Sequence, residues 1–276
     1  DIMERSMRIG VVGNGVVGNA TALAFSRLHE VRITDRIRAK ETHQLSDVLS
    51  CDIVFLCLPT PQNERGLACD TSAIDSFFGH GMPRRFDNTN FVLRSTVPIG
   101  YTRRMRERWC LPNLVHSPEF LTARTAVEDA ANPTRLLIGS TEVRDGKPYV
   151  AYEEELCSLY VKRWPTVHIH HMTSDESEAV KLFQNSFSAV KISFFNEIRC
   201  LSDKLGLDWG RCMDALLAGG WISTQHTQVP GPDGKRGYGG SCLPKDIANL
   251  ADCMKKSGLE WWMLDAAMSR NAEDRK

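Results

Sequence analysis

The sequence lacks an excess of charge of either sign, a pairing pattern among its cysteines and a long apolar run. It has 34 basic and 34 acidic side chains in 276 residues, so charge does not favour nucleic acid or a membrane surface as a partner. Its nine cysteines form no CxxC pair, which favours free thiols in a reducing compartment. No apolar run approaches the length of a membrane span. We therefore expect a cytoplasmic protein, and an enzyme.

The length is sufficient for two domains with a sizeable core. Hydrophobic residues make up 42% of the chain and charged residues 25%, which is ordinary for a globular protein. The first residues, "DIMERSM", contain no apolar signal core, and we expect Met7 to be the natural start.

A glycine motif near the N-terminus predicts a dinucleotide site. The apolar run "MRIGVV" predicts a buried parallel strand, and "GNGVVG" and a helical stretch follow it directly. In this context Gly13 permits a tight turn, Gly15 lets a pyrophosphate approach the backbone, and Gly18 lets the helix pack closely on the strand. The alternative is a glycine turn without a cofactor. The candidate cofactor-binding residues of the motif are Gly13, Gly15, Val16, Val17 and Gly18.

A second strand, "EVRITD", ends in Asp35, where a carboxylate can bond the ribose hydroxyls and repel a 2′-phosphate. NAD is therefore favoured over NADP as the cofactor. Further strands are expected within residues 52–61, 90–98, 113–120 and 135–140. Each ends in Pro, Ser, Thr or Gly or runs on into such residues, as strands do at the ligand-binding edge of a parallel sheet. The candidates at these strand ends are Pro59, Thr60, Ser95, Thr96, Glu119 and Phe120.

From about Ser174 to Gly206 the apolar residues recur at helical spacing, which predicts one long helix. Lys181 and Asn185 are four residues apart and share one face of it. Lys181 lies beside the apolar stripe and is a candidate functional residue; the alternative is a solvated charge. The prediction is an α/β chain, with a Rossmann-type doubly wound sheet in residues 7–172 and a mostly helical central domain in residues 173–276.

The loop "RGYGGSCLPKD" places a thiol among glycines. Pro244 suits the first turn of a helix, so Cys242 is expected just before a helix N-terminus, where the helix dipole favours a thiolate. This context indicates a nucleophile. A small buried thiol in a turn is the alternative. Asp246 either takes part in the chemistry or only complements the helix dipole.

Taken together, these motifs resemble the UDP-glucose/GDP-mannose dehydrogenase family. The matching stretches occur in the family's order between Met7 and roughly Asp252 and include "CLPTP", "RSTVPIG", "SPEFL", "EAVKLFQNSF" and "GYGGSCLPKD". Members oxidise the C6 alcohol of a nucleotide sugar to a carboxylate with two molecules of NAD. The resemblance implies that Cys242 forms a thiohemiacetal and then a thioester, and that Glu119 handles the proton of the hydrolytic water.

The resemblance also implies that Lys181 and Asn185 stabilise an oxyanion and that Thr96 and Asp246 position the water. It implies a homodimer through the central helix, and UDP-glucose as the substrate; GDP-mannose and N-acetylated UDP sugars stay open. The substrate-binding residues that it implies are Glu119, Phe120, Leu121, Lys181, Asn185, Tyr238, Gly239 and Gly240.

The sequence departs from the family's pattern at its end and before the cysteine loop. It stops at Lys276, where family members continue into a second Rossmann-like domain, so we expect a short form or a shortened chain. It also lacks the family's Arg-Ile-Gly element. Two other functions stay open: a two-electron hydroxyacid dehydrogenase of the same architecture, and an inactive NAD-binding protein. In the cluster of His168, His170 and His171, His168 and His170 would share one strand face without a clear third ligand, so a solvated cluster and no metal site is expected.

Overall fold

The structure is a computed structural model that describes residues 6–63, 69–79, 89–111 and 113–276. The chain divides into two compact units, one formed by residues 1–60 and 70–181 and the other by residues 61–69 and 182–276. The domain boundary expected at residues 172 and 173 falls beside the junction of the last strand of the sheet, which ends at Thr173, with the long helix that begins at Ser174.

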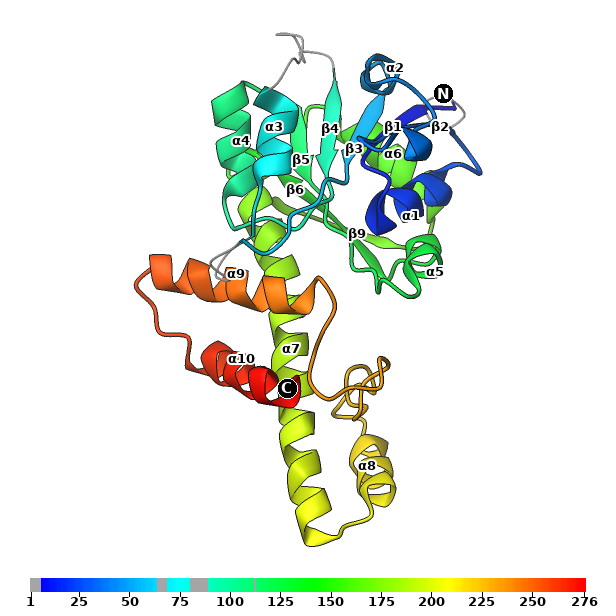
Figure 1. The fold of residues 1–276 in the computed structure, drawn as a ribbon. Helices are drawn as coiled ribbons and strands as arrows, with labels where there is room; N and C mark the ends of the chain where they lie inside the picture. The colour runs from blue at the N-terminus through cyan, green and yellow to red at the C-terminus, as the bar shows by residue number, and fades with distance from the viewer. Residues whose placement is uncertain (1–5, 64–68, 80–88, 112) are drawn as a thin grey trace. The chain divides into compact units, whose positions relative to one another are not determined.

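In the described part of the first unit, seven strands form one sheet in the order β2-β1-β3-β4-β5-β6-β9 (Figure 1). The neighbouring strands from β2 to β5 are parallel, as the apolar runs predict. The strands are β1 (Arg8–Val12), β2 (Glu30–Thr34), β3 (Ile53–Leu56), β4 (Asn90–Leu93), β5 (Leu114–His116), β6 (Arg135–Ser140) and β9 (His168–Thr173).

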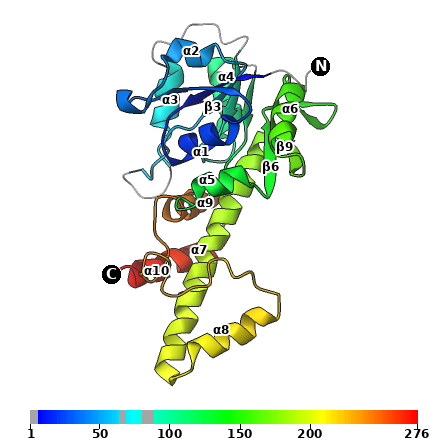
Figure 2. The same ribbon diagram turned by 90° about the vertical axis from the view of Figure 1, so that its right-hand side faces the viewer.

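Helices cover both faces of this sheet, as Figures 1 and 2 show. One buried cluster joins the sheet to α1, α5 and α6, and a second joins it to α2, α3 and α4. A short hairpin and a 3₁₀ turn complete the unit. These elements are α1 (Val16–Phe25), η1 (Arg38–Lys40), α2 (Leu45–Leu49), α3 (Ser72–Gly79), α4 (Tyr101–Trp109), α5 (Ala126–Ala131), β7 (Glu142–Arg144), β8 (Lys147–Tyr149) and α6 (Glu153–Arg163).

The central strand β3 is apolar at every position because both of its faces are buried. In β3, Ile53 and Phe55 belong to the first cluster, whereas Val54 and Leu56 belong to the second. Successive side chains of a strand point to opposite faces, so one short run supplies both cores. This confirms the doubly wound sheet predicted from the sequence.

One strand departs from the expectation. β6 pairs with β5 in the antiparallel direction, and β9 is parallel to β6. The carboxyl end of β6 at Ser140 therefore lies at the edge of the sheet opposite to the ends of β1 to β5. The prediction that residues 135–140 end at the ligand-binding edge was wrong, because a strand's own apolar pattern carries no information about its direction.

The helices of the other unit are largely arranged around α7 (Ser174–Leu205), which begins in the first unit at Ser174 and continues through the second. Its bounds confirm the predicted long helix. One cluster packs α7 against α9 and α10, and another packs it against α8 (Figure 1). The remaining helices are α8 (Trp209–Ala218), α9 (Leu243–Lys256) and α10 (Trp262–Asp274). Across the described residues, none of the helices combines the length and the hydropathy that a membrane span requires.

Candidate active site

The glycine motif forms the turn between β1 and α1. Gly13 has a positive φ of 90°, and a Cβ at Gly18 would lie 1.8 Å from the Gly13 carbonyl oxygen, so both positions require glycine. Around Gly15, by contrast, no atom lies within 4 Å of a Cβ placed there. The motif thus leaves space at the one glycine where a ligand has to approach the backbone.

The start of α1 suits an anion. Val16 is exposed and Val17 half-buried there, and the first turn carries no acidic side chain. The backbone N–H groups at a helix N-terminus, with the helix dipole, form a binding site for phosphate groups. The residues of this turn therefore fit the pyrophosphate of NAD.

Asp35 follows β2 and stands beside the glycine turn. Its carboxylate accepts hydrogen bonds from the backbone N–H groups of Asn14 at 2.6 Å and Ile37 at 2.8 Å. Partial burial works against ionisation, but these bonds and the nearby Lys40 and Arg36 lower the pKa of Asp35 overall. A fixed negative charge therefore lies next to the turn, as an NAD site needs.

Side-chain hydrogen bonds tie together the loops that follow β3 and β4. The Thr60 hydroxyl donates to the Thr96 carbonyl at 2.8 Å, and the Ser95 hydroxyl donates to the Leu58 carbonyl at 2.6 Å. Thr60, Ser95 and Thr96 are buried, whereas Pro59 is exposed. These strand-end candidates therefore lie together at the carboxyl edge of the sheet.

A buried ion pair joins the segment after β5 to α7. The Lys181 Nζ atom lies 3.1 Å from Glu119 Oε1, and both side chains are at least nine-tenths buried. The other Glu119 oxygen accepts a hydrogen bond from the Leu121 N–H group at 2.6 Å, and Lys181 lies 5.4 Å from the centre of the Phe120 ring. Lys181 is thus held in a buried pair, not solvated on the helix surface.

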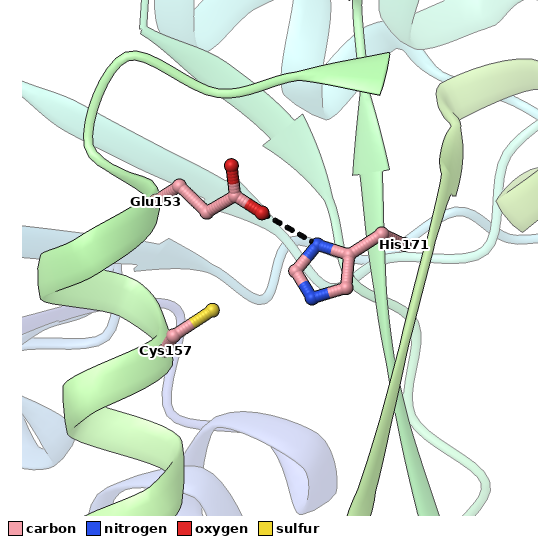
Figure 3. A group of neighbouring side chains, drawn as sticks. All are labelled: Glu153, Cys157 and His171. Atoms are coloured by element: carbon pink, nitrogen blue, oxygen red, sulfur yellow. Dashed lines mark ion pairs between the residues drawn. The ribbon is translucent and has the colours of Figure 1, made fainter. Parts of the chain in front are cut away.

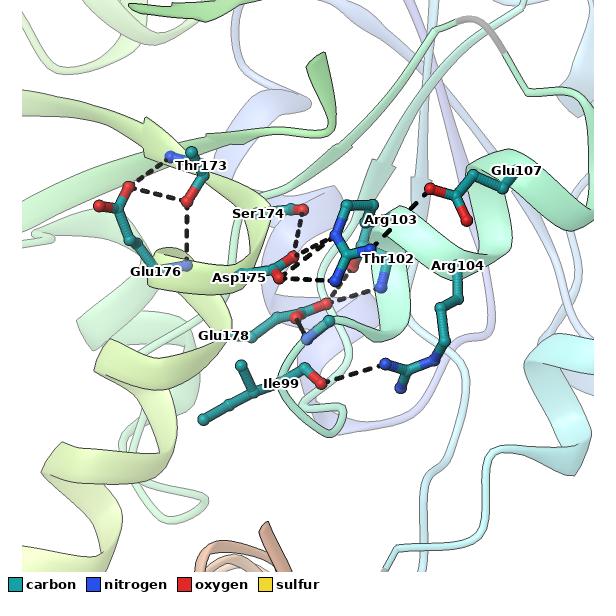
Figure 4. A network of polar contacts seen from close by, with 11 residues as sticks. Ile99, Thr102, Arg103, Arg104, Glu107, Thr173, Ser174, Asp175, Glu176 and Glu178 are labelled. Carbon is teal, nitrogen blue, oxygen red and sulfur yellow. Dashed lines mark hydrogen bonds and ion pairs between the residues drawn. The ribbon is translucent and has the colours of Figure 1, made fainter. Parts of the chain in front are cut away.

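The same face of α7 carries Glu178, which the sequence analysis did not single out. Its carboxylate accepts hydrogen bonds from the N–H groups of Gly100 and Thr102 and from the Thr102 hydroxyl, at the start of α4 (Figure 4). Burial raises the pKa of Glu178 to about 7, against the effect of these bonds. The signal was the spacing of 178, 181 and 185, since residues three, four and seven apart share one helix face.

His116, the last residue of β5, was also missed. It is fully buried, its Nδ1 lies 2.9 Å from the Ser177 hydroxyl of α7, and its Nε2 lies 3.4 Å from the Ser95 carbonyl. Burial lowers the pKa of His116 to about 3, so the ring is neutral at physiological pH. With Glu178, it fixes the first turns of α7, and hence Lys181, against the sheet.

In the second unit, Cys242 is the N-cap residue of α9 and Pro244 stands in the first turn, as predicted. The thiol is exposed, and it lies 3.8 Å from the Ser241 hydroxyl. One turn further, Asp246 is fully buried and accepts hydrogen bonds from Lys245 and, at 2.6 Å, from the Asn185 side chain. The structure therefore brings Asn185 and Asp246 together beside the start of the helix that Cys242 caps.

The glycines before Cys242 divide into two kinds. A Cβ at Gly239 would lie 2.7 Å from the Arg275 guanidinium, whereas a Cβ at Gly240 would meet no atom within 4 Å. Gly240 also has a positive φ of 74°. Tyr238 is buried, which raises its pKa to about 12, and its N–H group donates to Asn271. Tyr238 and Gly239 are thus used in packing against α10, while Gly240 faces open space.

Comparison with known proteins finds that the models of two domains of one family match this chain. The profile of the NAD-binding domain of the UDP-glucose/GDP-mannose dehydrogenase family matches residues 28–161, and that of the family's central domain matches residues 175–273. A UDP-glucose 6-dehydrogenase of Campylobacter jejuni is 30% identical over 88% of this chain and 67% of its own length. A Streptococcus pneumoniae protein of the same name is 28% identical over 88% of this chain and 68% of its own length.

Solved structures share the fold. A UDP-glucose dehydrogenase from Pyrobaculum islandicum has a TM-score of 0.81 at 22% identity, covering 98% of this chain and 69% of its own. A 3-hydroxyisobutyrate dehydrogenase of Mycobacterium tuberculosis has a TM-score of 0.70 at 18% identity, covering 98% of this chain and 94% of its own. The chain spans about two thirds of the length of the sequence relatives that it matches. It belongs to the UDP-glucose/GDP-mannose dehydrogenase family of NAD-dependent oxidoreductases.

Proposed function

We propose that this chain oxidises the C6 alcohol of a nucleotide sugar to the carboxylate, with UDP-glucose as substrate and UDP-glucuronate as product. The observation that carries the proposal is the exposed Cys242 thiol at the N-terminus of α9, next to the buried Asn185–Asp246 pair. A two-electron alcohol dehydrogenase needs no thiol, whereas an oxidation that passes through a thioester does. The UDP-glucose 6-dehydrogenases among the relatives supply the choice of sugar.

The reaction removes two hydrides from the same carbon, and NAD⁺ would accept both when bound. The C6 hydroxyl proton leaves to solvent with the first hydride to give the aldehyde. After the first, the Cys242 sulfur adds to the aldehyde carbon, and the aldehyde oxygen becomes the hydroxyl of a thiohemiacetal. Loss of the second hydride and of the hydroxyl proton gives a thioester on Cys242. Water then attacks the thioester carbon, which releases the carboxylate and returns the thiol.

In this scheme, Lys181 and Asn185 of α7 donate hydrogen bonds that stabilise the oxyanion. An ammonium group has three N–H donors, of which Glu119 takes one from Lys181, and a side-chain amide has two, of which Asp246 takes one from Asn185. On the resemblance to the family, we assign the remaining donors of Lys181 and Asn185 to the oxygen on which negative charge develops. Glu119 accepts the proton of the hydrolytic water, and Thr96 and Asp246 position that water.

Counting NADH per sugar with wild-type protein and Cys242→Ala tests this function. The thiol is exposed and caps no N–H group, so its removal should leave the fold intact. We expect about two NADH per UDP-glucose for the wild type and no completed turnover for Cys242→Ala. Cys212→Ala, another exposed thiol of the same unit, is the matched control and should behave as the wild type. GDP-mannose and N-acetylated UDP sugars are assayed in parallel.

The alternative is a two-electron hydroxyacid dehydrogenase, which the structural similarity to 3-hydroxyisobutyrate dehydrogenase favours. That reaction gives one NADH per substrate and is indifferent to Cys242. NAD binding without turnover of any substrate would instead support an inactive NAD-binding protein. None of the nine cysteines, all of which lie within the described residues, forms a disulfide; this fits a reducing compartment, and the cytoplasm is therefore part of the proposal.

We also propose a homodimer through α7. Five large apolar side chains of this helix are each more than half exposed: Phe183, Phe187, Phe194, Leu201 and Leu205. At 100° per residue they fall within a stripe only about 40° wide and about 33 Å long. A stripe of this kind fits a second copy of the same helix across a two-fold axis. Phe187→Asp should give a monomer in analytical ultracentrifugation. Trp221→Asp, which changes an exposed aromatic residue outside α7, should leave the dimer intact.

A further inference from the structure

The first unit holds a group of three metal-ligating side chains outside the candidate active site. Glu153 and Cys157 are one turn apart on α6, so they share one face of that helix. His171 stands on β9 opposite that face. Figure 3 shows the three side chains pointing toward one another. We propose that Glu153, Cys157 and His171 bind one zinc ion.

The distances are close to those of a coordination site. His171 Nδ1 lies 2.8 Å from Glu153 Oε1, and one donor atom from each of the three residues lies within 4.8 Å of the other two. In a tetrahedral zinc site, with ligands about 2.0 to 2.3 Å from the metal, donor atoms are about 3.5 Å apart. Closing the group therefore requires movements of about 1 Å. The side chains can make them, since Glu153 and Cys157 are half-buried and His171 is exposed.

The donor set selects the metal. Nitrogen, sulfur and carboxylate oxygen together are typical of zinc, whereas magnesium and calcium prefer oxygen donors alone. One thiolate and one carboxylate balance the two charges of the ion. The fourth position of the tetrahedron is left for water or another small ligand.

The thiol has no evident role without a metal. Cys157 is half-buried, one helical turn from Glu153 and opposite His171. A bound zinc ion would hold its sulfur as a thiolate and at the same time neutralise Glu153. The ion would thus give the sulfur and the carboxylate a common partner.

This group is not evident from the sequence because its residues belong to two elements. His168 and His170 pack ring to ring, with centroids 4.4 Å apart. His171 points to the other face of β9, toward α6. The other two ligands, Cys157 and Glu153, lie 14 and 18 residues earlier in the chain. Only the packing of α6 against β9 places them together.

Cobalt titration of the full chain tests the proposal, because a cobalt–thiolate bond gives a charge-transfer absorption band that zinc then abolishes by displacement. We expect one cobalt ion per chain with this band. Cys157→Ser should remove the band, and His171→Ala should weaken binding by more than the 10- to 100-fold typical of residues that only hydrogen-bond to a ligand. Cys212→Ser and His170→Ala, which change an exposed thiol and the neighbouring histidine, should leave the band unchanged.

A second measurement guards against misfolding of Cys157→Ser. Zinc at a hundredfold excess over its Kd should raise the melting temperature of the wild type by about 5 to 10 °C. Glu153→Gln keeps the size of the side chain and should reduce this shift. A band that survives Cys157→Ser, or no band at all, would overturn the proposal. So would a melting-temperature shift that His170→Ala abolishes, since the metal would then lie on the His168–His170 pair.

Discussion

Replacing Glu178 by glutamine should change the pH dependence of stability in a defined direction. Burial raises the pKa of Glu178 from 4.5 to about 7 in the folded protein. A group with a raised folded-state pKa contributes stability that is fully present below its unfolded pKa and is lost as the pH rises through its folded pKa. The relevant window therefore lies between about pH 4 and pH 8.

The magnitude follows from the two pKa values. At 1.36 kcal/mol per pH unit, the difference between 4.5 and about 7 corresponds to about 3 kcal/mol. Glutamine does not titrate, and its amide nitrogen would face one of the N–H groups at the start of α4, at a cost of about 1 to 3 kcal/mol. The free energy of unfolding of the wild type should thus exceed that of Glu178→Gln most clearly near pH 4. That advantage should shrink by about 3 kcal/mol toward pH 8.

Urea unfolding of both proteins at a series of pH values measures this difference. Glu176→Gln is the matched control, because Glu176 is an exposed residue of the same helix end and hydrogen bonds from Thr173 lower its pKa. Its contribution has the opposite sign and grows as the pH rises above its folded pKa. The reasoning about Glu178 is wrong if the difference between wild type and Glu178→Gln stays constant with pH. It is also wrong if that difference grows with pH, because the three hydrogen bonds would then outweigh burial.

Three further predictions concern the glycine turn and Asp35. Gly18→Ala should destabilise the protein by about 3 kcal/mol in urea unfolding, since its Cβ would lie 1.8 Å from the Gly13 carbonyl oxygen. Gly15→Ala should leave stability unchanged but weaken NAD binding in calorimetry. If this variant binds NAD as tightly as the wild type, the pyrophosphate does not approach the backbone at Gly15. Asp35→Asn should raise the affinity for NADP relative to NAD by about tenfold, because it removes a negative charge beside the turn. An unchanged ratio of the two dissociation constants would place the ribose elsewhere.

The parts of the fold that the sequence predicted are those with local signals. The glycine turn, the helix from Ser174 and the Pro244 helix start each depend on a few neighbouring residues, and the structure has them where they were expected. The direction of β6 was not predictable in this way, because it depends on the edge of the sheet at which the chain enters this strand. Burial was not predictable from the sequence either. The sequence allowed Lys181 to be a solvated charge, whereas its buried partners, Glu119 and Phe120, lie about 60 residues away in the chain.

The candidate site follows the same division. Lys181, Asn185 and Cys242 were singled out from motifs, and the hydrogen-bond partners of Lys181 and Asn185 lie on other parts of the chain, at Glu119 and Asp246. Glu178 reads in the sequence as one of several acidic residues at a helix start, yet it is fully buried. The roles of these residues in catalysis stay predictions that the NADH count tests.

The continuity of α7 sets a limit on how this protein can vary. Glu178, Lys181 and Asn185 are spaced along one uninterrupted helix, so their mutual orientation depends on the number of residues between them. Inserting or deleting a single residue there would turn Asn185 by about 100° and shift it by about 1.5 Å relative to Lys181. Loops tolerate changes in length, but this segment tolerates only substitution. Length changes compatible with function are therefore to be sought beyond Asn185, or in the loops that join the helices.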